Sequence, residues 1–279
     1  MRGRSGWVPS WDGTWLSWRA WEAEEPRGVL LVVHGLGEHA GRYGRLAAAM
    51  VPRGWSCWAA DLRGMGASEG RRGHLERWSD WVRDVRRFHE LVATEVPDRE
   101  VVPLGHSFGG VIVTTAVLSG DLRPRRFVLS NPAFRLRDRV PLPKLLLGRV
   151  ASRAVPALTL PSGLDPETLA RDPAVAEAYR ADPLVHDRIS ARLFAEWEAA
   201  AGEALRLAPR LEVPFLVLVS GGDGLVDHTG SLELDRRAAC RHTLRFYPAA
   251  AHEPFNDLDA EAVFRDLTEW LEDGPDQPA

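Results

Sequence analysis

The sequence predicts an α/β protein whose central sheet is mostly parallel, flanked by helices and interrupted by a helical insertion. Short, continuous apolar runs such as residues 29–33 and 213–219 are typical of strands covered on both faces of a parallel sheet. Segments with helical apolar spacing alternate with these runs. A long stretch without a strand pattern then separates the early strands from the last two. We therefore expect a sheet domain made of residues 1–130 and 210–279, and a helical cap made of residues 131–209.

The first half of the chain carries most of the predicted strands. Residues 14–21 follow an Asp12-Gly13 turn and divide their tryptophans between two faces, which indicates an antiparallel ribbon at the sheet edge. Pro103 cannot donate a ladder hydrogen bond, so we expect a local irregularity in its strand. The predicted elements, in order, are a strand at 14–21, a strand at 29–33, a helix at 43–53, a strand at 55–60, a helix at 79–92 and a strand at 101–104.

A Gly-x-Ser-x-Gly motif at residues 105–109 follows the last of these strands. An apolar, uncharged segment, residues 110–118, comes next, and in this context Ser107 is expected on a tight strand-to-helix turn with its hydroxyl exposed. We predict a helix there although its β-branched residues favour a strand. The alternative is that Ser107 only caps a helix. The motif recurs at residues 66–70, but arginines follow Ser68, so we place Ser68 in a loop.

The pattern changes after a further strand at residues 126–130. Nine prolines lie between residues 131 and 209, and no strand signal interrupts them. Asp165 and Asp172 each precede a proline, which is typical of the start of a helix. The remaining predicted elements are a longer helix at 190–208, strands at 213–219 and 243–247, and a closing helix at 260–271.

Composition excludes several classes of function. The chain has 279 residues with 45% hydrophobic and 27% charged residues, which is ordinary for a soluble globular protein. A net charge of −4 gives no basic footprint for nucleic acid. No apolar run is long enough to span a bilayer and no signal peptide is visible, so we expect a cytoplasmic protein. The two cysteines, Cys57 and Cys240, indicate neither a disulfide framework nor a metal site.

Three residues that follow predicted strands fit nucleophilic catalysis. A serine nucleophile needs a base, and the base needs an acid to orient it. Ser107, Asp223 and His252 occur in the order nucleophile, acid, base, each at the carboxyl end of a predicted strand. Asp227 is the alternative acid, but Asp223 follows its strand and two glycines directly. We therefore predict acyl transfer in which Ser107 attacks an ester carbonyl and His252 moves the proton.

The segment after the strand at residues 29–33 offers a second interpretation. His34, Glu38 and His39 are potential metal ligands, but no further ligand lies nearby in the sequence. We therefore predict no metal and no cofactor.

Several motifs together resemble the monoacylglycerol lipase and lysophospholipase-like group of α/β-hydrolases. The motifs are His34-Gly35-Leu36-Gly37-Glu38-His39 with Arg42-Tyr43, Asp61-Leu62-Arg63-Gly64, Ser68-Glu69-Gly70, Gly105-His106-Ser107-Phe108-Gly109-Gly110, Asp182-Pro183-Leu184, and the loops of Asp223 and His252. The resemblance covers most of the chain. It departs at Met65, where the family has a histidine that is not catalytic, and it is weakest in the cap.

The resemblance implies a serine carboxylester hydrolase that cleaves single-chain acyl esters of the monoacylglycerol or lysophospholipid type through an acyl-enzyme. In this fold the backbone N–H groups of Leu36 and Phe108 form the oxyanion hole. The alternatives are a pseudo-hydrolase that binds without turnover, and a perhydrolase or aminopeptidase on the same fold. An aminopeptidase would need acidic groups in the cap to hold an ammonium. The candidates are Glu167, Asp172, Glu177, Asp182, Asp187, Glu196 and Glu198.

Large aliphatic residues gather early in the predicted cap. The candidate substrate-binding residues are Leu142, Leu145, Leu146 and Leu147. We expect them to line the entrance for an acyl chain or to enter a membrane surface, with Lys144 and Arg149 near the headgroups. The alternative is a buried cap core. The expected partners are therefore a small lipid ester and a transient, peripheral membrane contact through the cap.

Overall fold

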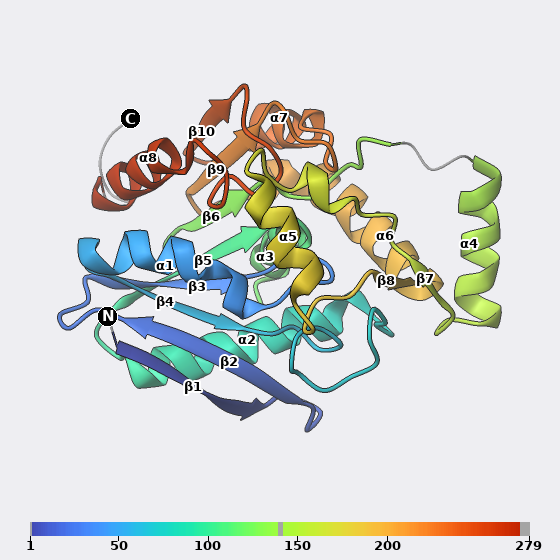
Figure 1. Cartoon of the computed structure of the whole chain (residues 1–279), viewed down its shortest axis with the longest axis horizontal. Coiled ribbons are helices and arrows are strands. Elements are labelled where there is room, and N and C mark those ends of the chain that lie inside the picture. The colour runs from blue at the N-terminus through green and yellow to red at the C-terminus, as the bar shows by residue number, and fades with distance from the viewer. Residues whose placement is uncertain (1, 139–141, 274–279) are drawn as a thin grey trace.

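The computed structural model describes residues 2–138 and 142–273, and it has the predicted α/β architecture (Figure 1). Eight strands form one sheet in the order β1-β2-β4-β3-β5-β6-β9-β10, parallel from β4 to β10 and antiparallel where β2 pairs with β1 and β4. The strands are β1 (Arg2–Pro9), β2 (Trp15–Glu22), β3 (Gly28–Val33), β4 (Trp55–Ala60), β5 (Glu100–His106), β6 (Phe127–Ser130), β9 (Phe215–Ser220) and β10 (His242–Tyr247).

Helices cover both faces of this sheet, which explains the continuous apolar runs. Every residue of β3, β4, β6 and β9 is buried. One face packs against α1 and α8, and the other against α2, α3 and α6. The helices are α1 (Gly44–Met50), α2 (Trp78–Glu95), α3 (Phe108–Ser119), α4 (Leu142–Ala154), α5 (Pro173–Ala181), α6 (Ala191–Leu207), α7 (Thr229–Arg237) and α8 (Ala260–Glu272), with short 3₁₀ turns at Ala40–Tyr43, Val51–Arg53, Pro166–Thr168 and Ala208–Arg210.

Two local expectations were wrong. β5 runs through Pro103 without a break, since Pro103 pairs with Leu31 of β3, and the pairing with β6 begins one residue later, at Leu104. Residues 131–209 also contain a small antiparallel ribbon of β7 (Thr159–Pro161) and β8 (Arg188–Ser190). Three-residue strands are too short to show the alternation that identifies a strand in a sequence.

Between β6 and β9 the chain leaves the sheet and crosses its carboxyl edge, where α5 lies in front of the sheet and α4 at the far end of the molecule (Figure 1). Main-chain hydrogen bonds tie this excursion to the core. The His186 N–H donates to the Gly37 carbonyl at 2.9 Å, and the Glu253 N–H donates to the Leu169 carbonyl at 2.7 Å. Both core residues belong to loops that follow sheet strands. Among the described residues, no helix is long and apolar enough to cross a bilayer.

At the opposite edge of the sheet, where the parallel strands begin, a buried arginine links several elements. Arg126, directly before β6, donates to both carboxylate oxygens of Glu100, at 3.2 and 2.9 Å, and to the carbonyls of Trp270 and Leu271 at the end of α8. Its side chain also lies over the rings of Trp55 and Trp270. Arg126 therefore joins β5, β6 and α8 at the amino ends of the strands.

Arg126→Met should lower the free energy of unfolding by about 3 kcal/mol, because it breaks a buried ion pair and leaves the Glu100 carboxylate without its partner. Urea denaturation followed by circular dichroism measures this change. Arg123→Met is the matched control, since Arg123 is exposed and makes one bond, to Gly120, and it should stay within about 0.5 kcal/mol of wild type. Equal midpoints for the two variants would contradict the role given to Arg126.

Candidate active site

The turn between β5 and α3 carries Ser107. Its backbone has φ 54° and ψ −118°, a conformation that is rare for residues other than glycine. The flanking glycines are required by close packing. A Cβ at Gly109 would lie 2.0 Å from the Val33 carbonyl oxygen, and a Cβ at Gly105 would lie 2.4 Å from the Gly109 carbonyl oxygen. The predicted helix after Ser107 is confirmed as α3, despite its β-branched residues.

His252 and Asp223 form a buried hydrogen-bonded pair beside this turn. His252 Nδ1 lies 2.7 Å from Asp223 Oδ2. The other oxygen, Oδ1, accepts from the backbone N–H groups of Leu225 and Val226 at 2.8 and 2.9 Å. The turn after β9 therefore fixes one oxygen of the carboxylate, and the other oxygen binds the imidazole of His252.

For each residue of this pair, burial and the charge of its partner shift the pKa in opposite directions. Burial would raise the pKa of Asp223, but the charge and hydrogen bond of His252 and the Val226 and Leu225 amides hold that pKa below its ordinary value. Burial would lower the pKa of His252, but Asp223 raises it above its ordinary value. His106, whose ring lies 4.8 Å from that of His252, behaves differently, because burial, followed by His252, lowers its pKa to about 3.

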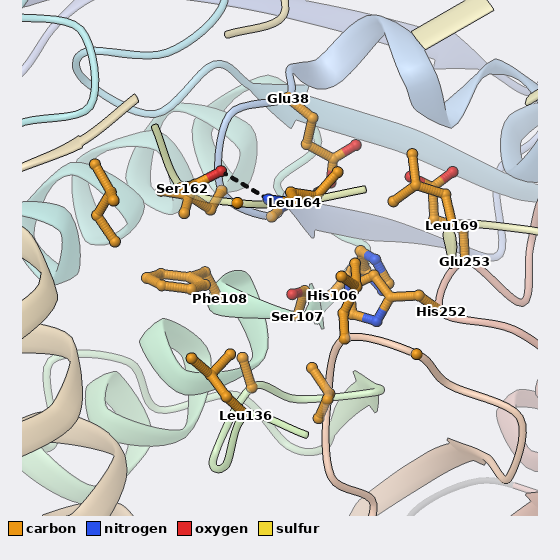
Figure 2. Close-up of a pocket in the computed structure, with 18 of the residues that line it drawn as sticks. Glu38, His106, Ser107, Phe108, Leu136, Ser162, Leu164, Leu169, His252 and Glu253 are labelled. Carbon is orange, nitrogen blue, oxygen red and sulfur yellow. Dashed lines mark hydrogen bonds between the residues drawn. The ribbon is translucent and has the colours of Figure 1, made fainter. Parts of the chain in front are cut away.

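Ser107 and His252 both line one cavity of about 200 Å³ (Figure 2). Leu36 and Phe108 also line this cavity. Most of the remaining wall is apolar and combines core loops with the 131–209 excursion. The apolar residues are Ala133, Leu136, Leu164, Leu169, Ile189, Phe194, Trp197, Leu225 and Val226.

The oxyanion-hole candidates Leu36 and Phe108 both line this cavity. Within the described ranges, neither Leu36 N–H nor Phe108 N–H donates to a protein acceptor. For Phe108 this follows from its place in the first turn of α3, where a helix leaves its N–H groups without intrahelical partners. Among the described residues, both N–H groups therefore lack a protein acceptor.

A polar cluster that sequence reasoning missed forms one end of the cavity. Arg42 donates to both oxygens of Glu253, at 2.6 and 2.9 Å, and to Glu38 at 3.2 Å. Glu38 also accepts from the Gly35 N–H and the Tyr43 hydroxyl. Burial would lower the pKa of Arg42, but Glu253 and Glu38 raise it, so the guanidinium stays charged. The available signal was the spacing of Glu38 and Arg42 together with a carboxylate directly after His252.

The candidate metal ligands are each engaged elsewhere. His34 binds the Gly35 carbonyl through Nδ1 and the Leu62 N–H through Nε2. His39 Nε2 lies 2.7 Å from Asp182 Oδ2. In the part of the chain that the structure describes, no cluster of three or more His, Cys, Asp or Glu side chains is arranged to hold a metal ion.

The other serine and acid lie outside the cavity. Ser68 Oγ donates to the Asp61 carbonyl and accepts from Ser17 N–H, which are bonds of a structural loop residue. Asp227 accepts from the Thr229 N–H at the start of α7. Neither residue lines the cavity that contains Ser107.

The candidate acyl-binding leucines lie on or near α4. Leu146 and Leu147 are 52% and 69% exposed and are not part of the cavity wall. The side chains of Leu142 and Leu145 lie outside the described part of the structure. The cavity thus draws its apolar wall from α6, from β8, from the segment before α5 and from the loops after β6 and β9, rather than from the described side chains of α4.

Comparison with known proteins identifies the group. The family described as "Serine aminopeptidase, S33" matches residues 24–259. The monoacylglycerol lipase of Mycolicibacterium smegmatis is 34% identical over 88% of this chain and 89% of its own, and the human monoglyceride lipase is 31% identical over 93% and 88%. The crystal structure of Paleococcus ferrophilus monoacylglycerol lipase superposes with a TM-score of 0.81 at 31% identity, covering 97% of this chain and 98% of that one. The chain is therefore a serine ester hydrolase that belongs to the serine aminopeptidase S33 family and, within it, to the α/β-hydrolases that resemble monoacylglycerol lipase.

Proposed function

We propose that this enzyme cleaves monoacylglycerols or similar single-chain acyl esters, with Ser107 as nucleophile, His252 as general base and Asp223 as the acid that orients it. The observation that carries the proposal is the buried Asp223–His252 pair beside Ser107 in a mostly apolar cavity. The two relatives that are 34% and 31% identical carry the names monoacylglycerol lipase and monoglyceride lipase.

The reaction follows from the positions of these groups. His252 accepts the hydroxyl proton as Ser107 Oγ attacks the ester carbonyl, and Asp223 stabilises the imidazolium that forms. The N–H groups of Leu36 and Phe108 bind the oxyanion of the tetrahedral intermediate. His252 then gives its proton to the departing alcohol, which leaves Ser107 acylated. Water, activated by the same imidazole, attacks the acyl-enzyme and releases the fatty acid.

The two ends of the cavity suit the two ends of such a substrate. The apolar wall formed by Phe194, Trp197 and Leu136 accommodates an acyl chain, and each buried methylene contributes about 0.8 kcal/mol of binding. Arg42 and Glu253, next to His252, offer donors and acceptors to the hydroxyl groups of the alcohol. This division supports an ester of a small polyol with one fatty acid.

The acidic residues that an aminopeptidase would need are placed differently. None of the seven cap carboxylates named as candidates lines the cavity. The carboxylates of Glu38, Glu253 and Asp138 do line it, and Arg42 lies between the first two and neutralises part of their charge. Beside His252, where Arg42 pairs with Glu253, this arrangement favours a neutral alcohol over a substrate ammonium.

We further propose that residues 131–209 form a cap whose outer face contacts a membrane surface transiently, as a peripheral interaction. Leu146, Leu147 and Val150 of α4 are exposed at 52, 69 and 63%. Residues 146 and 150 are one helical turn apart, so their side chains share a face with the neighbouring Leu147. An exposed apolar helix face of this kind binds at a lipid interface without spanning it.

Ser107→Ala should lower kcat for a short p-nitrophenyl ester by about 10⁶-fold, as removal of the nucleophile does in a triad. A steady-state assay measures the loss, and thermal melting checks that the fold is kept. Ser68→Ala is the control from the second Gly-x-Ser-x-Gly motif. It removes two hydrogen bonds, one of them buried, and should lower stability while leaving kcat near wild type. A large loss of kcat in Ser68→Ala alone would refute the choice of nucleophile.

Asp223→Asn should lower kcat by about 10⁴-fold, because the imidazole loses the partner that fixes its tautomer. The pH profile should also change. Wild-type activity requires neutral His252 and is lost as pH falls through a pKa held above its ordinary value. Without the Asp223 charge, that acidic limb should move to lower pH. Asp227→Asn, which neutralises a carboxylate that does not line the cavity, should change neither kcat nor the limb, and equal effects in both variants would contradict the assignment.

Replacing Leu146 and Leu147 together by serine should weaken binding to phospholipid vesicles by at least about tenfold, because two exposed leucines no longer enter the interface. Cosedimentation with vesicles measures the binding. Turnover of p-nitrophenyl acetate should remain at the wild-type rate, since neither side chain lines the cavity. Unchanged vesicle binding would exclude this face as the contact surface.

A further inference from the structure

The segment that follows β6 is bonded to the turn that carries Ser107. The Ser107 N–H donates to the Ser130 carbonyl at 3.0 Å, and the Ala133 N–H donates to the Ser107 carbonyl at 3.0 Å. Ser107 is thus held from both sides by residues that flank Asn131. The Asn131 N–H extends the sheet pairing by donating to the Leu218 carbonyl at 2.9 Å.

The side chain of Asn131 bonds to both of the other two loops of the site. Its Oδ1 accepts from the Ser220 N–H at 2.7 Å, and its Nδ2 donates to Ser220 Oγ and to the His252 carbonyl, both at 2.8 Å. Ser220 is the last residue of β9 and is followed by the two glycines before Asp223. One carboxamide therefore joins the start of the Asp223 loop to the main chain of His252.

The burial and the backbone conformation of Asn131 both indicate that this position requires an asparagine. The residue is 2% exposed and has φ 42°, one of two positive values among described residues other than glycine, the second being Ser107 itself. Asparagine tolerates this region better than most residues. It also provides two N–H donors and one acceptor in a single planar group, and all three are used here.

We propose that Asn131 is a positioning residue that holds His252 and Asp223 in register with each other and with Ser107. The inference rests on the proposed roles of these three residues. Asn131 lies outside the cavity wall and does not touch the substrate. It acts through its hydrogen bond to the His252 carbonyl. Without that bond, the main chain of His252 can shift, and the imidazole then moves away from the line between Asp223 and the reacting oxygen. Displacements of about 1 Å are costly at such a site.

The test compares two variants of Asn131. Asn131→Gly removes all three side-chain bonds while keeping the positive φ without strain. Asn131→Asp keeps an acceptor for the Ser220 N–H, but its carboxylate cannot donate to the His252 carbonyl. For both, kcat for a short p-nitrophenyl ester should fall at least about tenfold with KM within about twofold of wild type. The rate of labelling of Ser107 by a fluorophosphonate probe should fall in parallel.

Ser56→Ala is the matched control for lost stability. Ser56 is buried near the amino end of β4, opposite the carboxyl edge that carries the site, and accepts from the Ala23 N–H at 3.1 Å. Its melting temperature should fall as that of Asn131→Gly does, with kcat unchanged. If both Asn131 variants keep the wild-type kcat and labelling rate, Asn131 is only structural and the inference is overturned. A wild-type enzyme that the probe does not label would instead refute the nucleophile itself, and the inference with it.

Discussion

The close approach of the turn at Ser107 to the neighbouring strand β3 is the constraint on which the site depends. Gly109 lies so near the Val33 and His34 carbonyls that no side chain fits there. This contact places the start of α3 beside the loop after β3, so that Leu36 and Phe108 line the same cavity. Packing on both sides maintains the strained backbone of Ser107, and the stability of the buried sheet offsets the free-energy cost of that strain.

The sequence predicted the sheet domain well because its signals are local. Continuous apolar runs identified β3, β4, β6 and β9, and the glycines around Ser107 identified the turn despite the strand propensity of α3. Ser107, Asp223 and His252 could be proposed from the sequence because each lies in the segment that follows a strand, and the structure joins two of them by a hydrogen bond. The cavity wall was not found, since Phe194 and Trp197 lie on α6 at helical spacing that a buried helix would also show.

The other features that the sequence did not predict depend on contacts between residues that are far apart in the chain. Nothing near Arg42 in the sequence indicates that Glu253 is its partner, because the two meet only when the last strand is in place. The short ribbon of β7 and β8 depends likewise on two segments separated by α5. Asn131 was not singled out in the sequence, because its bonds to Ser220 and His252 exist only in the folded sheet.

The attachment of the excursion between β6 and β9 has a consequence for divergence. The part around α5 is bonded through backbone atoms to the loops of Leu36 and His252, so change there would disturb the chemistry. Helix α4 packs on α6 at the far end of the molecule and has no such bond among the described residues (Figure 1). The sequence of α4 can therefore change, and the helix can be lengthened or exchanged between relatives, without moving Ser107, Asp223 or His252. Natural variation in this group should accumulate there first, and chimeric enzymes are best joined at its ends.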